Sequence, residues 1–160
     1  MSYGNLACNG GLMDNAFKYL ESNAIETEAA YPYAGKRGTC EYSATKGQFK
    51  VTGFHDVTPN SPSQLLAAVA QQPVSIAIEA DKAAFQLYKG GIITGTACGT
   101  TLDHGVLLVG YGSENGQDYW IVKNSWGPTW GEKGYVRLGR DNVTGPGVCG
   151  LQQEPSYPTV

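Results

Sequence analysis

Hydrophobic side chains recur at helical spacing near the start of the chain. Residues 12–24 carry a single apolar stripe, which predicts a helix that packs against a second layer. The stretch 26–47 has no sustained period and contains Tyr31-Pro32-Tyr33, so we predict a long loop there. The stripe consists of Leu12, Met13, Ala16, Phe17, Leu20 and Ala24.

After residue 48 the pattern favours strands, which we predict at 49–57, 74–79, 105–111, 118–124 and 134–138. The second of these alternates strictly: Val74, Ile76 and Ile78 share one face, and Ser75, Ala77 and Glu79 share the other.

A short helix is predicted between the first two of these strands. Ser61 offers a capping hydroxyl, Pro62 suits the first helical position, and Gln64 occupies the capping-box position. Gln72-Pro73 should end this helix. Together these elements predict an α+β fold, with a mainly helical first third, a β-sheet or β-barrel remainder, and a boundary near residues 47–56.

Composition agrees with a turn-rich, compact protein. The 160 residues include 22 glycines, and 41% of the residues are hydrophobic. The formal net charge of -3 leaves no polycationic surface for nucleic acid or an anionic membrane. The longest strongly apolar run, 106–109, is far too short to span a bilayer.

The cysteines favour disulfides over metal binding. Cys8, Cys40, Cys98 and Cys149 form no C-x-x-C pair and have no His at zinc spacing, so we expect no metal site. Disulfides would indicate an oxidising compartment. Free buried thiols in a cytosolic protein are the alternative.

One histidine and one asparagine should meet at the end of a hairpin. If Asn115-Gly116 is a two-residue turn, Asn124 faces Leu107, and if all of 112–117 is loop, it faces Gly105. Either register brings Asn124 near the level of His104, where its amide oxygen could orient the imidazole for catalysis. A simple packing pair is the alternative.

Six blocks of sequence resemble, in order and spacing, the papain-like cysteine peptidases, and most closely the cathepsin L branch. The resemblance covers essentially the whole chain, and its blocks are Cys8-Asn9-Gly10-Gly11, Leu102-Asp103-His104-Gly105-Val106, Gly110-Tyr111-Gly112, 119–127, 130–135 and 156–160.

The resemblance implies a Cys-His-Asn peptidase site. It makes His104 the general acid/base, Asn124 its orienting partner and Trp126 their shield from water. The family's C-G-S-C-W block, with the nucleophile, and the Gln of its oxyanion hole do not occur in this sequence. The chain then corresponds to roughly the last three quarters of a mature enzyme. Cys8 is not expected to replace the nucleophile, because it stands where the family has a disulfide cysteine.

The same resemblance implies a papain-like fold in two domains: residues 1–50 as the remnant of a helical domain, and residues 51–160 as an antiparallel β-barrel-like domain that carries His104 and Asn124. It pairs Cys98 with Cys149 and leaves Cys8 and Cys40 without their usual partners. The substrate groove would include Gly10, Gly11, Leu12, Met13, Ala77, Leu102, Asp103 and Gly105. Glu154 at the base of the main pocket would admit Arg as well as aromatic or Leu side chains.

Two functions are compatible with these residues. The first is a papain-like endopeptidase without cofactor, whose isolated chain is inactive. The second is a non-catalytic pseudo-peptidase that serves as a binding or structural protein. Expected partners are a peptide or protein substrate, a propeptide or cystatin-like inhibitor, and either the missing N-terminal segment or a second copy, but neither nucleic acid nor membrane. A lysosomal, vacuolar or secreted location is expected, with a possible glycosylation sequon at Asn142.

Overall fold

The computed structural model describes residues 3–141 and 143–160, so the sequon residue Asn142 lies outside the described residues. The chain forms two compact units. The first unit comprises Met1–His55 and Pro158–Val160, and the second comprises Asp56–Tyr157. The predicted division of the protein into domains 1–50 and 51–160 stays a prediction.

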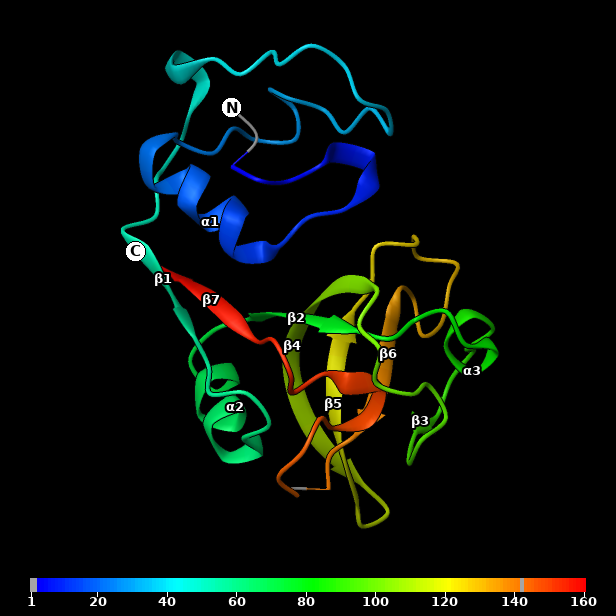
Figure 1. Ribbon diagram of the computed structural model, residues 1–160. Coiled ribbons are helices and arrows are strands. Elements are labelled where there is room, and N and C mark those ends of the chain that lie inside the picture. The colour runs from blue at the N-terminus through cyan, green and yellow to red at the C-terminus, as the bar shows by residue number, and fades with distance from the viewer. Residues whose placement is uncertain (1–2, 142) are drawn as a thin grey trace. The chain divides into compact units, whose positions relative to one another are not determined.

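The first unit contains little regular structure (Figure 1). Its elements are the 3-10 turns η1 (Ala7–Asn9) and η2 (Ala44–Lys46), the helix α1 (Met13–Ser22) and most of the strand β1 (Gly53–Asp56). The predicted helix and the long loop after it are confirmed, although no residue of α1 is fully buried. The loop supplies few apolar side chains, and Val51 is the one buried hydrophobic residue among the described residues of this unit.

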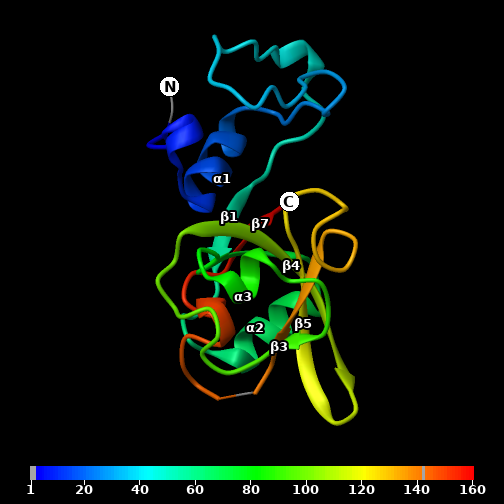
Figure 2. The ribbon, with the colours of Figure 1, turned by 90° about the vertical axis from the view of Figure 1, so that its right-hand side faces the viewer.

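The second unit is built on a sheet (Figures 1 and 2). Across the whole chain the strand order is β1-β7-β2-β4-β5-β6-β3. Neighbours in the second unit run antiparallel except for β3 and β6, which are parallel. The helices and strands are α2 (Pro62–Val69), β2 (Val74–Ile78), α3 (Ala83–Gln86), β3 (Ile92–Ile93), β4 (His104–Glu114), β5 (Gln117–Lys123), β6 (Tyr135–Gly139) and β7 (Ser156–Thr159), with the 3-10 turn η3 (Val148–Gly150) before β7.

Most predicted elements of the second unit are confirmed, including the two-residue turn Asn115-Gly116, where both φ angles are positive. The helix α2 starts at Pro62 as predicted, but the Ser61 side chain makes no capping hydrogen bond. Its hydroxyl lies 3.5 Å from that of Ser63 instead. The pattern did not predict α3, β3 or β7, because each has four residues or fewer.

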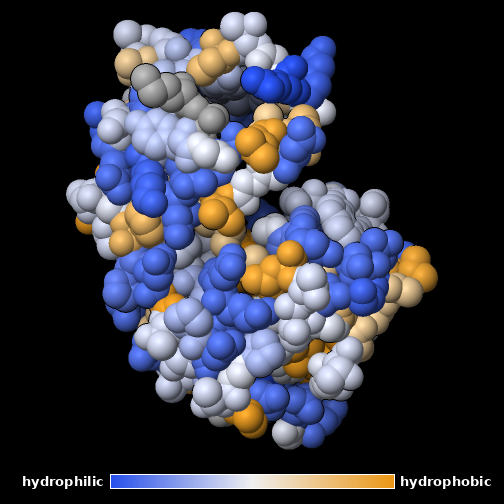
Figure 3. All heavy atoms as spheres, viewed as in Figure 1, coloured by the Kyte–Doolittle hydropathy of each residue, from blue (hydrophilic) through white to orange (hydrophobic). Residues whose placement is uncertain are grey.

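The hydrophobic core lies in the second unit. Val74, Ile76 and Ile78 are all fully buried, as their alternation predicts. A disulfide between Cys98 and Cys149 is buried in the same core. On the face shown in Figure 3, the exposed hydrophobic residues form separate spots among hydrophilic ones. No helix in the described part of the chain has the length and hydrophobicity needed to cross a bilayer.

Candidate active site

A β-bulge sets the register that brings the predicted site residues together. Near the turn the pairing is regular, with Gly110 opposite Ile121, but Leu108 lies opposite Val122, so Val109 is an extra residue in β4. Continued by one residue, the pairing places Asn124 level with Val106. The predicted partners Leu107 and Gly105 are therefore both wrong by one position.

This one-residue difference decides which side of the sheet Asn124 faces. Opposite residues of an antiparallel pair share a face, and residues two apart on a strand share a face. Val106 and His104 therefore lie on the same face, whereas Leu107 lies on the other. Without the bulge, the Asn124 side chain would point away from His104.

The two side chains form a direct hydrogen bond. His104 Nε2 lies 2.8 Å from Asn124 Oδ1. The backbone N–H of Ser125 donates to the same Asn124 atom, also at 2.8 Å, so that atom must be the amide oxygen. Because an amide oxygen only accepts, the ring Nε2 must carry the proton and donate it. The other ring nitrogen, Nδ1, is therefore the unprotonated one in the neutral imidazole.

Aromatic side chains surround this pair. The indole of Trp126 stacks on the His104 ring, with centroids 5.2 Å apart and planes 30° apart. Trp126 meets Trp130 and Phe85 edge to face, at 5.4 Å and 5.5 Å. Asn124 itself is only 7% exposed. The hydrogen bond therefore ends on a buried amide among aromatic rings, and the lower local dielectric there strengthens it.

An ion pair fixes the loop that carries both tryptophans. Glu132 accepts two hydrogen bonds from the Arg137 guanidinium, at 2.9 Å and 2.8 Å, and one from the backbone N–H of Gly91 at 3.0 Å. The Arg137 hydrogen bonds, followed by the Gly91 N–H, hold the pKa of Glu132 below its usual value, although burial acts in the opposite direction. The loop 125–134 is therefore tied to β6 by a charged, bidentate contact.

Contacts connect several of the groove residues predicted for the second unit. Ala77 and Gly105 are direct partners across β2 and β4. A side chain at Gly150 would collide with Leu102 Cδ2, and Gln153 Nε2 donates to the Thr100 carbonyl at 2.8 Å. These contacts tie the segment before Glu154 to the segment that carries Leu102. Glu154 itself is exposed.

Four of the predicted substrate-binding residues, Gly10, Gly11, Leu12 and Met13, belong to the first unit. Gly10 has a positive φ of 97°, and nothing lies near the place of its missing Cβ. At Gly11 a Cβ would collide with Asn5 Oδ1, so close packing within the first unit also requires a glycine at this position. Leu12 is exposed and Met13 is half-buried. The substrate contacts expected of these four residues stay predictions.

The cysteines of the two units differ in state. Cys98 and Cys149 are bonded to each other, whereas Cys8 and Cys40 are exposed free thiols. Within the described ranges, no cluster of three or more His, Cys, Asp or Glu side chains could hold a metal ion.

The sequence pattern did not predict the burial of one carboxylate, that of Glu79. The alternation predicts Glu79 on the polar face of its strand, yet β2 ends at Ile78 and Glu79 is only 4% exposed. Its neighbour Gly99 has a φ of 75°, and a Cβ there would collide with the carboxylate. In the sequence, Gly99 after the disulfide cysteine Cys98 is a sign of close packing at that position, but it does not identify Glu79 as the side chain packed there.

An imidazole held by a carboxamide at the end of a hairpin, with an indole stacked on it, is oriented for taking up and releasing a proton at its second ring nitrogen. Comparison with known proteins shows the family. The family described as papain family cysteine protease matches residues 1–159. The chain belongs to this family.

Individual relatives support the same assignment. Cysteine proteinase RD21A of Arabidopsis thaliana is 53% identical over 156 residues, which is 96% of this chain and 34% of RD21A. The bromelain protease of Ananas comosus, solved with the inhibitor E64, superposes with a TM-score of 0.90 at 40% identity, over 100% of this chain and 74% of that one. The proform of the ragweed pollen allergen Amb a 11, a cysteine protease, gives a TM-score of 0.92 at 44% identity, over 98% of this chain and 48% of that one.

These comparisons confirm the predicted papain-like α+β fold and the cathepsin L-like relationship. The chain spans about a third of the length of RD21A.

Proposed function

We propose that this chain supplies the acid/base half of a papain-type peptidase site. His104 is the general acid/base, Asn124 orients it and Trp126 shields the pair. The observation that carries the proposal is the hydrogen bond from His104 Nε2 to Asn124 Oδ1, 2.8 Å long, because it commits one ring nitrogen to the amide and leaves the other for chemistry. The nucleophilic cysteine and the oxyanion glutamine would come from the C-G-S-C-W region, which this sequence does not contain.

The proposed reaction moves one proton in and out of His104 Nδ1. The imidazole takes the proton of the cysteine thiol, and the thiolate attacks the peptide carbonyl carbon. The imidazolium then gives that proton to the leaving amine as the C–N bond breaks and a thioester remains. His104 next removes a proton from water, which attacks the thioester and releases the second product. Throughout the reaction Asn124 Oδ1 accepts a hydrogen bond from the Nε2–H of His104, and this hydrogen bond stabilises the charged ring.

Substrate selection is proposed to depend on Glu154. Ala77, Leu102 and Gly105 would form the apolar wall of a pocket for the second residue before the scissile bond. The exposed carboxylate of Glu154 would pair with an Arg side chain by two charge-assisted hydrogen bonds. Asp103, Gly10, Gly11, Leu12 and Met13 are proposed as further substrate contacts.

The first unit is proposed to need a covering partner. Val51 is its one buried hydrophobic side chain among the described residues, while Leu6, Leu12 and Phe49 are all more than half exposed. Apolar surface of this kind favours association. A further segment of a longer protein or a second copy of the chain would cover it. A propeptide or a cystatin-like inhibitor is proposed to bind at the substrate site, and the buried disulfide supports a vacuolar, lysosomal or secreted location.

A chimera tests the proposed activity. The matching 156 residues of RD21A would be replaced with those of this chain, so that RD21A provides the nucleophile region. We expect the chimera to hydrolyse a dipeptidyl fluorogenic substrate with a P2 Leu and to be blocked by E64. The chain alone should hydrolyse nothing. A chimera that melts cooperatively but has no activity would contradict the proposal, as would E64-sensitive turnover by the pure chain.

A further inference from the structure

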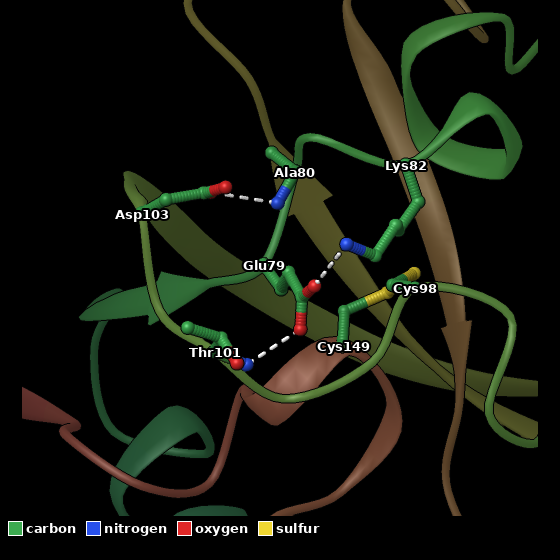
Figure 4. Close-up of a disulfide and its surroundings, with 7 residues drawn as sticks. All are labelled: Glu79, Ala80, Lys82, Cys98, Thr101, Asp103 and Cys149. Carbon is green, nitrogen blue, oxygen red and sulfur yellow. Dashed lines mark hydrogen bonds and ion pairs between the residues drawn. A yellow bond between two sulfur atoms is a disulfide. The ribbon is translucent and has the colours of Figure 1, made fainter.

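The buried carboxylate of Glu79 lies directly beside the segment that leads into the proposed catalytic histidine (Figure 4). Glu79 follows Ile78, whose Cα pairs with that of His104 across β2 and β4. Its backbone N–H donates to the Cys149 carbonyl at 2.8 Å, which fixes the main chain of Glu79 against η3. Its side chain turns toward residues 98–103, the link between the disulfide and His104.

Each oxygen of the Glu79 carboxylate accepts from a different donor. Oε2 accepts the backbone N–H of Thr101 at 2.5 Å, and Oε1 lies 2.8 Å from the ammonium of Lys82. The ammonium and the Thr101 N–H both favour the ionised form, and they hold the pKa of Glu79 below its usual value despite burial. Figure 4 shows the carboxylate between these two donors. The same ammonium also reaches Asp81, at 3.0 Å.

Other contacts hold the two ends and the middle of this link. The disulfide fixes Cys98, and the Thr100 carbonyl accepts a hydrogen bond from Gln153 Nε2 at 2.8 Å. The N–H of Asp103 donates to the Ile78 carbonyl at 2.9 Å, and its Oδ1 accepts a hydrogen bond from the Ala80 N–H at 2.7 Å. The hydrogen bond to Glu79 is the contact that fixes Thr101. Thr101 is exposed to solvent, so without the carboxylate its N–H would turn to water. A hydrogen bond to a charged acceptor is stronger than one between neutral groups.

We propose that Glu79 is a positioning residue for His104: its carboxylate holds Thr101, and thereby the link 98–103, so that the imidazole meets Asn124 in a single orientation. The proposal rests on the proposed role of His104. Glu79 touches neither the imidazole nor the reacting atoms and acts through the main chain that precedes His104. The close packing of Gly99 against the carboxylate serves the same purpose, because any side chain at position 99 would displace it.

The test observes the imidazole directly. The chain has two histidines, so labelling with ¹⁵N-histidine gives two ring systems, and His104→Gln assigns them. In the full chain we expect His104 to show Nε2 protonated, Nδ1 bare and a slowly exchanging Nε2–H. In Glu79→Gln the exchange of this proton should accelerate by about tenfold and the ring should populate both tautomers, because the hydrogen bond to Asn124 becomes intermittent.

Three further variants separate positioning from general stability. Glu79→Asp keeps the charge but is one methylene shorter, so it should show the same loss, and it serves where Glu79→Gln does not fold. Lys82→Met leaves the Thr101 contact in place and should keep the wild-type His104 ring signals. Asp118→Asn removes the ion pair with Arg140 at the far end of β5 and should also leave them unchanged.

Two results would overturn the proposal. One is a folded Glu79→Gln chain with wild-type His104 signals, which would reduce Glu79 to a stabilising residue. The other is an equal effect from Lys82→Met, which would assign the effect to the ion pair. Neither readout requires peptidase activity. A disturbed imidazole in Glu79→Gln together with an inactive chimera would therefore contradict the proposed function and leave the positioning role standing.

Discussion

The hydrogen bond between His104 and Asn124 can be measured by removing each partner in turn. In Asn124→Ala the amide oxygen disappears, and both the His104 Nε2–H and the Ser125 N–H lose their acceptor. Each such hydrogen bond contributes about 0.5–1.5 kcal/mol to stability. Asn124 Nδ2 is buried without a hydrogen-bond partner in the described structure, so its removal offsets part of the loss. We expect Asn124→Ala to lower the free energy of unfolding by about 1–2 kcal/mol.

A double-mutant cycle isolates the pair itself. Combining Asn124→Ala with His104→Ala should give a coupling energy of about 0.5–1.5 kcal/mol. The hydrogen bond from the Ser125 N–H is lost in Asn124→Ala whether or not His104 is present, so its contribution cancels in the cycle. Urea unfolding followed by tryptophan fluorescence is the assay, since all three tryptophans lie in the second unit.

A control cycle uses a residue remote from the pair. Asp118 is six residues away along β5, a distance of roughly 20 Å, so Asp118→Ala should add to Asn124→Ala without coupling. A His104–Asn124 coupling below about 0.3 kcal/mol, no larger than the control, would refute the hydrogen bond as the orienting contact.

Other parts of the structure give separate expectations. Replacing Cys98 and Cys149 with Ala should lower the free energy of unfolding by up to about 4 kcal/mol, since the bond closes a loop with a sequence separation of 51, and calorimetry would check this. The lowered pKa of Glu132 means that its contribution is complete at neutral pH and is lost as the pH falls below about 4.5, because the unfolded chain takes up the proton first. Glu132→Gln should therefore lower stability at pH 7 and flatten the decline in urea midpoint at acid pH; an unchanged pH slope would argue against the Arg137 pair. In the RD21A chimera, Glu154→Ala should lower kcat/KM for a P2 Arg substrate by about 10- to 100-fold and leave a P2 Leu substrate within a few-fold.

The sequence predicted those parts of the fold that depend on local pattern. The alternation of Val74, Ile76 and Ile78 requires one buried face, and Asn115-Gly116 requires a tight turn, so β2 and the hairpin were predictable. The helix α1 was predictable for the same reason. The short elements α3, β3 and β7 were not, because four residues or fewer carry no period and form only against neighbours that are distant in the sequence.

The site shows the same division between local and distant information. The turn brings His104 and Asn124 to one end of the hairpin, but only the extra residue Val109 determines that they share a face, and no feature of 104–111 marks it as a bulge. The alternation predicts Glu79 on the polar face because it extends the strand through this residue. Its actual environment depends on Thr101 and Lys82, which the chain brings together only after folding.

The claim on which the function depends is that His104 transfers the proton in a peptidase reaction. The most direct measurement is kcat/KM of the RD21A chimera with and without His104→Ala, under conditions where both proteins are folded by circular dichroism. We predict a fall of about 10²- to 10⁴-fold or more, the contribution of a general acid/base, with the urea midpoint little changed. A folded His104→Ala chimera that retained more than about a tenth of the hydrolysis would contradict this account.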